Sequence, residues 1–420
     1  MSKYLLFVLA LSVVTHFAFF GHPNETVFDE VHFGKFVSGY YTGEYYFDIH
    51  PPLGKLMIAG FAKLFDFEPE FNFAEIGKEF PDKKYLALRF LPILAGTLLP
   101  LVIFLLIKEL ALSSLAAFTG ALLIIFDNAL LTQSRLILLD PFLLLFGFAS
   151  LLFCFKKKYL LMAIFAGLTI SIKWTGLGFI ALPIAIESYE KFRELLTNRS
   201  YDRFVSSVLG LAKLASFFLI SLAIYFSIFA LHFALLPNPG PGDAFMKQGF
   251  REENIVKNIW NLNLEMYRSN QRLTATHPYS SSWYEWPFSY KPIFYWVRDG
   301  AKIYLQGNPV IWLASAIAVA ISIKYLVSSV KRRKPDKILT MLLSGYFLNL
   351  LPFVGVKRVM FLYHYLTALI FAILILVYLV EKQKNPKKIF GILLIVSIAV
   401  FLYLAPLTYG LEVPPQFKFY

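Results

Sequence analysis

A cluster of ionisable side chains lies near the start of the chain, between Phe28 and Lys55. It consists of Asp29, Glu30, His32, Asp48 and His50. A carboxylate just outside an apolar segment can take the proton from a hydroxyl group and act as a general base. An Asp followed by a helix is also the ordinary pattern of a helix N-cap, so the spacing of Asp29 leaves both interpretations open.

The same cluster could bind a metal ion. Asp29, His32 and His50 are oxygen and nitrogen ligands of the kind that divalent metals take. Their spacing is not diagnostic, so we assign no metal ligand, no cofactor is certain, and a divalent metal ion remains an open alternative. His50 is followed by two prolines, which fits a rigid turn at the start of a helix as well as a ligand.

Two arginines downstream are candidates for binding a phosphate. Arg135 lies in Gln-Ser-Arg-Leu-Ile-Leu-Leu-Asp, and its guanidinium could fork onto a phosphate or instead reach the membrane interface or Asp140. Arg358, with Lys357 beside it, enters a later apolar segment. Lys173 precedes a Trp at the edge of another such segment, where membrane anchoring is the simpler interpretation.

Aromatic residues form a block at positions 277–287, His-Pro-Tyr-Ser-Ser-Ser-Trp-Tyr-Glu-Trp-Pro. His277, Trp283 and Trp286 could cover a sugar or a peptide, or form an aromatic belt at a membrane surface. His364 lies in a second aromatic run, where a packing role competes with a role in binding substrate.

The composition places these residues in a membrane protein. The 420 residues are 58% hydrophobic and only 16% charged, whereas a soluble protein carries about 25% charged residues. The net charge of +13 falls largely in short loops between apolar runs, as membrane orientation requires, and no basic soluble module indicates nucleic-acid binding. The single cysteine, Cys154, excludes a disulfide framework.

The apolar runs predict an all-α polytopic membrane protein of one domain, residues 1–420, with about eleven spans. The expected spans are 4–20, 89–107, 113–130, 136–155, 159–172, 174–188, 211–236, 308–330, 338–354, 360–380 and 388–408. The first is interpreted as a retained span, because aromatic residues stand where a signal peptidase site needs small ones.

Loop charge predicts the orientation of the spans. Lysine and arginine concentrate in alternate loops, which places the N-terminus in the cytoplasm and the C-terminus outside. Two long external segments result, 21–88 with the Asp-Glu pair and 237–305 with the aromatic block. Helical spacing of apolar residues in the first segment predicts amphipathic helices at the membrane interface. Neither segment reads as a soluble domain.

Taken together, these motifs resemble the protein O-mannosyltransferase family. The resemblance is carried by Phe-Asp-Glu-Val-His-Phe-Gly-Lys-Phe at 28–36 and Phe-Asp-Ile-His-Pro-Pro-Leu-Gly-Lys at 47–55. Ser-Arg-Leu-Ile-Leu-Leu-Asp at 134–140, Ile-Lys-Trp-Thr-Gly at 172–176, the aromatic block, Gly-Asn-Pro-Val at 307–310 and Met-Phe-Leu-Tyr-His-Tyr-Leu at 360–366 follow in the order of the family.

The resemblance implies the GT-C fold and transfer of mannose, with inversion, from dolichyl or another polyprenyl phosphate to Ser or Thr of a translocated protein in the cell membrane. It implies that Asp29 and Glu30 are catalytic and that Arg135 binds the donor phosphate, helped by Arg358. It also suggests dimers. The external segment at 237–305 lacks the large soluble sugar-binding-like module of eukaryotic members, which indicates a minimal prokaryotic type.

Three alternatives stay open. The first is a transferase of the same architecture that acts on a lipid or glycan acceptor. Transport is the second, although transporters place polar groups near the middle of the bilayer, whereas the polar clusters here lie on external segments. A non-catalytic assembly scaffold is the third.

Overall fold

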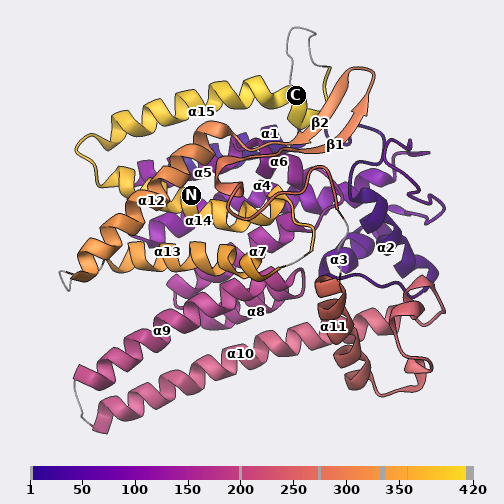
Figure 1. Ribbon diagram of the computed structural model, residues 1–420, viewed down its shortest axis with the longest axis horizontal. Helices are drawn as coiled ribbons and strands as arrows, with labels where there is room; N and C mark the ends of the chain where they lie inside the picture. The colour runs from indigo at the N-terminus through magenta and orange to yellow at the C-terminus, as the bar shows by residue number, and fades with distance from the viewer. Residues whose placement is uncertain (1–2, 198–200, 273–275, 332–335, 357, 413–420) are drawn as a thin grey trace.

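The computed structural model describes residues 3–197, 201–272, 276–331, 336–356 and 358–412. Most of these residues are helical (Figure 1). The helices are α1 Lys3–Phe17, α2 Glu30–Thr42, α3 Leu53–Ala62, α4 Tyr85–Glu109, α5 Ser114–Ile125, α6 Asn128–Ser134, α7 Asp140–Phe155, α8 Tyr159–Ile170, α9 Leu177–Thr197, α10 Tyr201–Leu235, α11 Ile255–Arg272, α12 Pro309–Lys331, α13 Lys337–Leu350, α14 Leu366–Glu381 and α15 Pro386–Tyr409. The strands are β1 Ile293–Arg298 and β2 Ala301–Leu305.

Long apolar helices run side by side along the longest axis of the molecule (Figure 1). Helix α14 packs against α5, α12 and α13, and nearly all of its side chains are buried. It carries no charge between Leu366 and Val380. A helix that is apolar all round belongs in the interior of a bundle, and α14 forms that interior here.

The helical membrane class is confirmed, and each expected span falls on helix in the described part of the chain. Six described helices are long and apolar enough to cross a bilayer: α4, α15, and the segments Ala215–Leu235, Pro309–Ser328, Lys337–Gly355 and Leu362–Glu381. Helices α5 and α6 add a pair bent by 61°, whereas α1, α7, α8 and Trp174–Ile186 are apolar but shorter. The count of eleven therefore stays a prediction.

A buried carboxylate holds the bend between α5 and α6. Asp127 caps α6 by accepting from the Leu130 N–H at 3.0 Å, and it accepts from the Trp312 indole at 2.7 Å. The Asn308 N–H also donates to this carboxylate at 3.2 Å. Helix α12 thus begins at Pro309, directly after Asn308, and packs against the bend. The direction of α6 after the bend determines where Arg135 and the start of α7 lie.

A β-hairpin interrupts the helical pattern in the second external segment. Strands β1 and β2 pair antiparallel around Asp299 and Gly300, which both have positive φ. Asp-Gly is a strong hairpin signal, because both central residues of the tight turn need that backbone conformation. The expectation of a wholly helical chain was therefore incomplete at this point.

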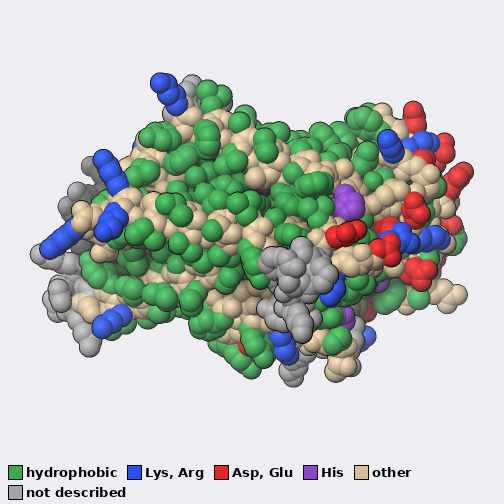
Figure 2. Space-filling view, turned by 90° about the horizontal axis from the view of Figure 1, so that it is seen from above, with side chains coloured by type: hydrophobic (Ala, Val, Ile, Leu, Met, Phe, Trp, Pro, Cys, Tyr) green, Lys and Arg blue, Asp and Glu red, His purple; other side chains and the backbone are tan. Residues whose placement is uncertain are grey.

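Charge separates along the same axis. Figure 2 shows hydrophobic side chains over the middle of one face, Lys and Arg toward one end, and Asp and Glu gathered at the other end with some Lys and Arg. The first external segment, with α2 and α3, lies at the acidic end (Figure 1). This distribution is the one expected of a bilayer-spanning protein with a basic cytoplasmic side. The assignment of the two sides stays a prediction.

Candidate active site

Asp29 occupies the N-cap position of α2, but its side chain makes no capping hydrogen bond. The preceding Phe28 has a φ of 48°, and its ring stacks on Tyr295 of β1 with centroids 3.9 Å apart. A non-glycine residue is strained at positive φ, so the stacking helps to hold a conformation that turns the chain into α2. The Asp29 carboxylate is consequently free to meet a substrate.

The surroundings of Asp29 disfavour its charge. Desolvation raises the pKa of Asp29 to about 7, and the negative charges of Asp140 and Asp48 act in the same direction. Lys173 and Arg358 oppose this shift but are outweighed. The side chain nevertheless stays partly exposed. A carboxylate with a pKa near neutrality is suited to general-base work.

The neighbouring Glu30 has a different environment. It is fully buried and pairs with Arg89 of α4, whose two guanidinium nitrogens lie 2.6 and 2.7 Å from its carboxylate oxygens. The backbone N–H groups of Val27 and Ile137 also donate to Glu30, each at 2.9 Å. This geometry favours a positioning role, in which Glu30 ties the Asp29 loop to α4 and to the turn before α7.

The backbone N–H and the backbone carbonyl of His50 each make a hydrogen bond. Its N–H donates to the Asp48 carboxylate at 3.2 Å, and its carbonyl accepts from the Lys55 ammonium at 2.9 Å. Lys55 also pairs with Asp48 out of solvent. Burial lowers the pKa of His50 well below its usual value, and Lys173 and Arg358 add to the effect. His50 therefore presents a neutral imidazole.

A chain of hydrogen bonds joins β1, α6, α7 and the turn after α8 in the neighbourhood of Asp29. The Tyr295 hydroxyl donates to the Gln133 amide oxygen at 2.6 Å, and the Gln133 amide donates to Asp140 at 2.7 Å. Lys173 then donates to both oxygens of Asp140, at 2.8 and 2.9 Å. The Lys173 ammonium also lies over the Tyr363 ring, 5.4 Å from its centroid. Lys173 is thereby fixed in place in the turn between α8 and α9.

Asp140, Lys173 and Tyr363 line a cavity of about 230 Å³, whereas Asp29 is not among its lining residues. Its polar lining includes His50, Asp140, Lys173, Asn270, Arg358 and His364. The guanidinium of Arg358 lies 3.3 Å from Nε2 of His364, and both are only partly exposed. The cavity thus brings together Arg358, Lys173, His50 and His364, which the sequence had singled out at widely separated positions.

Arg135 lies elsewhere. Its guanidinium donates to the carbonyls of His16, Ala18 and Phe19 at 2.6–2.9 Å, and it stacks over Tyr409 with its central carbon 4.6 Å from the ring centroid. It is not among the residues that line the cavity. These contacts join the end of α1 to the end of α15, and the predicted contact with phosphate remains untested.

The two arginines should therefore respond differently to substitution. We expect Arg135→Ala to lower Tm by leaving three carbonyls of the α1 end unpaired, with little change in the donor KM of the folded fraction. Arg358→Ala should raise the donor KM by about tenfold if its guanidinium binds the donor phosphate, as the sequence predicts. Thermal unfolding and donor titrations of both variants test this. A donor KM that rises only in Arg135→Ala would restore the role predicted from sequence.

The aromatic block packs against the cavity wall. Trp286 is fully buried, and its ring stacks on His364 with centroids 5.8 Å apart. His277 packs edge-on against Phe361 at 5.1 Å, and Trp283 is partly buried against the core. Trp286 thus supports His364 from behind, and direct contact of this block with substrate stays a prediction.

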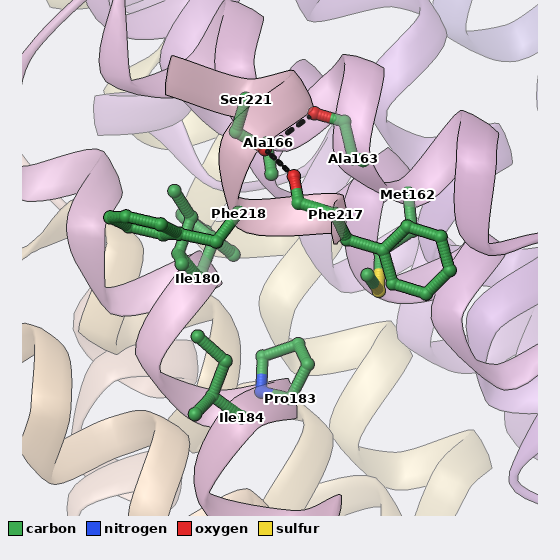
Figure 3. A pocket seen from close by; sticks show the side chains of 10 residues that line it. Met162, Ala163, Ala166, Ile180, Pro183, Ile184, Phe217, Phe218 and Ser221 are labelled. Atoms are coloured by element: carbon green, nitrogen blue, oxygen red, sulfur yellow. Dashed lines mark hydrogen bonds between the residues drawn. The ribbon is translucent and has the colours of Figure 1, made fainter. Parts of the chain in front are cut away.

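A second hollow between α8, α9 and α10 is apolar (Figure 3). Its one hydroxyl, on Ser221, donates to the carbonyls of Ala163 and Phe217. No titratable group lines this hollow, so it offers a surface for hydrocarbon and no chemistry.

Two sequence predictions find no test in the described residues. Among the described residues, no three His, Cys, Asp or Glu side chains lie close enough together to hold a metal ion by themselves. A divalent metal therefore stays a prediction. Lys357, the expected helper of Arg358, lies outside the described part of the chain.

Several residues of the site had escaped the sequence interpretation. Arg89, Gln133, Lys55 and Tyr295 had not been assigned functional roles, although they fix Glu30, Asp140, His50 and Phe28. A signal existed for the first of them. Arg89 is a charge near the start of an apolar helix, and a charge in such a place is expensive unless it is paired.

Known protein families match most of this chain. Residues 6–237 match the model of the dolichyl-phosphate-mannose-protein mannosyltransferase family, and residues 255–418 match that of the C-terminal four-span region of protein O-mannosyltransferases. Dolichyl-phosphate-mannose--protein mannosyltransferase 4 of Candida albicans is 36% identical over 59% of this chain and 35% of its own length. Protein O-mannosyl-transferase 2 of Danio rerio is 33% identical over 63% of this chain and 36% of its own length. The chain thus spans about a third of these curated relatives.

Solved structures show the same fold. A chain of the Saccharomyces cerevisiae Pmt1-Pmt2 complex bound to the sugar donor superposes with a TM-score of 0.91, at 18% identity, over 97% of this chain and 90% of that one. ArnT of Cupriavidus metallidurans bound to undecaprenyl phosphate gives 0.56, at 14% identity, over 96% of this chain and 65% of that one. The fold is that of a multi-span membrane glycosyltransferase. Within that class, the chain belongs to the dolichyl-phosphate-mannose-protein mannosyltransferase family.

Proposed function

We propose that this protein transfers mannose from a dolichyl or other polyprenyl phosphate to a Ser or Thr hydroxyl of a protein. The observation that carries the proposal is the uncapped Asp29 carboxylate, which interacts electrostatically with Asp140, Lys173 and Arg358 of the cavity lining. The names of the relatives, and the sugar donor bound to the Pmt1-Pmt2 complex, support the donor and the acceptor.

The proposed reaction is a single displacement at the anomeric carbon. Asp29 takes the proton of the acceptor hydroxyl while that oxygen bonds to the anomeric carbon. The bond from this carbon to the phosphate oxygen breaks, and its electron pair leaves with the phosphate. Arg358 and Lys173 stabilise the charge that gathers there, in a site largely shielded from water. One base on one face gives inversion, and Asp29 later returns its proton to water.

Glu30 and His50 complete this assignment. Glu30 acts through its pairing with Arg89, which positions the loop that carries Asp29. His50, with its neutral imidazole, can donate or accept a hydrogen bond at the sugar without competing for the phosphate. His364 is held between Arg358 and Trp286, with Nε2 at the Arg358 guanidinium and Nδ1 at the Phe361 backbone, and it thereby positions Arg358.

The proposal extends to the setting of the enzyme. The N-terminus would be cytoplasmic, with the C-terminus and the cavity outside the cell membrane. A dimer is supported by the Pmt1-Pmt2 complex to which the chain is similar. Only three 3-10 turns, α11 and one hairpin are seen between Leu235 and Pro309 among the described residues, which supports a minimal member of prokaryotic type.

The pH dependence of transfer tests the base. Asp29 must be ionised to accept a proton, and the pKa of Asp29 is about 7. We expect kcat/KM to rise with pH through about 7 and then to level off. Initial rates with purified enzyme, donor and acceptor peptide between pH 5 and 9 measure it. A profile already flat from pH 5 would show that no group with this pKa acts as the base.

Mass spectrometry of the products tests the acceptor. Purified enzyme is incubated with polyprenyl-phosphate mannose and either a Ser/Thr peptide or a lipid or glycan acceptor. A hexose added to Ser or Thr supports the proposal, whereas transfer to the lipid or glycan alone would replace it.

A further inference from the structure

Helix α11 lies across the direction of the membrane helices and not along it (Figure 1). Its inner side chains Ile259, Leu262 and Met266 form one apolar cluster with residues of α8, α9 and α10, among them Tyr225 and Phe229. Ala166 and Ile170 belong to the last turns of α8, and Ile180 belongs to the first turn of α9. Helix α11 therefore packs at the level where α8 ends and α9 begins, and α10 continues ten residues, about 15 Å, beyond Tyr225.

Hydrogen bonds fix α11 at this depth. The Trp174 indole donates to the Tyr225 hydroxyl at 2.9 Å, and that hydroxyl donates in turn to the Asn263 side chain of α11. Asn263 also donates to the Ile259 carbonyl at 2.8 Å. The helix is therefore docked on the membrane helices and on the turn that carries Lys173.

The outward side of α11 carries large apolar side chains. Val256 is 64% exposed, Trp260 69% and Tyr267 55%. At about 100° per residue these three positions fall within about 40° of one another around the helix. The basic Lys257 and Arg268 follow on the next arc. The helix thus presents one arc to the protein, a second apolar arc outward, and a polar arc beside it.

We propose that α11 is an in-plane helix whose Val256, Trp260 and Tyr267 insert into the outer leaflet of the bilayer. The occupant of this surface is lipid at the boundary between headgroups and acyl chains. The apolar surface of α10 continues at the level of this contact, with Phe226 39% and Leu231 46% exposed. An amphipathic helix at this depth, with an indole on its apolar arc and basic residues beside it, has the pattern of interfacial binding. A polypeptide would have to displace lipid to reach it.

This placement gives the cavity an opening at the level of the lipid headgroups. The last turns of α11 contribute Tyr267, Asn270 and Gln271 to the lining of the cavity that contains Arg358. If the proposed function holds, a lipid-borne phosphate can pass beside α11 from the bilayer to Arg358 while it stays at the level of the lipid headgroups. The membrane contact of α11 itself does not depend on that function.

Fluorescence quenching tests the membrane contact. The full chain is reconstituted in phosphatidylcholine vesicles with or without bromine on the acyl chains, and iodide is the quencher from water. The chain has six tryptophans, so the Trp260 signal is the difference between the unaltered protein and W260F. The matched control is R268W in the W260F background, which moves the indole two turns along, onto the polar arc.

We expect brominated lipid to remove about half or more of the Trp260 signal and iodide to remove little, as for an indole at the interface. The R268W signal should show the reverse. Quenching of Trp260 by iodide alone would overturn the proposal. Protection of Trp260 from iodide by an acceptor peptide would also overturn it and would assign the surface to polypeptide.

Discussion

Replacing Asp29 by Asn should abolish mannosyl transfer while the protein still folds and inserts. Loss of a positioned general base costs about 10²- to 10⁴-fold in rate, and Asn preserves the shape of the side chain. Because Asp29 makes no capping bond, the start of α2 should not depend on its charge. Single-turnover assays with saturating donor measure the loss, and donor binding measured separately should be retained.

The control is Asp66→Asn, in the same external segment. Asp66 is exposed and has a φ of 51°, a backbone conformation that Asn adopts as readily as Asp. Transfer by this variant should match that of the unaltered protein. If Asp29→Asn transfers mannose at the unaltered rate, Asp29 is not the base and the proposed reaction fails.

The substitution Asp29→Asn should also stabilise the protein at alkaline pH. A carboxyl group whose pKa is raised by folding, as that of Asp29 is to about 7, binds its proton more tightly in the folded state. Its contribution to stability is present below the unfolded pKa and is lost as the pH rises toward about 7. Tm of Asp29→Asn should therefore exceed that of the unaltered protein at pH 8, and the two should converge near pH 4. Equal values at both pH values would contradict the raised pKa.

The sequence predicted the elements of this site better than their contacts. Runs of apolar residues located the membrane helices, because a segment that crosses the hydrocarbon must be apolar over about 20 residues and must satisfy its backbone hydrogen bonds internally. The Asp-Glu pair, His50, Lys173 and Arg358 stood out because charged or polar groups are unusual in such a chain. Their convergence depends on tertiary packing, which residue spacing does not encode.

Arg135 and Arg89 show where residue type alone is insufficient. Both are arginines near the ends of apolar segments, and only Arg135 drew a functional prediction. In the structure Arg135 meets backbone carbonyls. Arg89 also meets backbone carbonyls, those of Gly21, Pro23 and Glu25, but in addition it pairs with the Glu30 carboxylate. An arginine binds carbonyl, carboxylate or phosphate oxygen with the same guanidinium, so the partner has to be seen.

The buried pair of Glu30 and Arg89 should give the largest loss of stability. Both side chains are fully excluded from solvent, so removing one charge leaves the other unpaired, which costs about 3–5 kcal/mol. Arg89→Met should therefore unfold at a much lower temperature than the unaltered protein. Glu30→Gln should behave similarly, because its amide N–H₂ would face the donors that now bond to the carboxylate.

The double variant Glu30→Gln/Arg89→Met separates a positioning role from catalysis. With both charges gone, no unpaired ion remains, and the double variant should be more stable than the sum of the single changes predicts. If Glu30 only positions the loop, the double variant should regain part of the transfer lost in Arg89→Met, with an unchanged pH profile, because Asp29 still supplies the base. If stability returns and transfer stays absent, Glu30 takes part in the chemistry itself. The role of Glu30 therefore follows from two measurements on the single and double variants. One is how far the effects of Glu30→Gln and Arg89→Met on the transfer rate depart from additivity, and the other is the same departure for Tm.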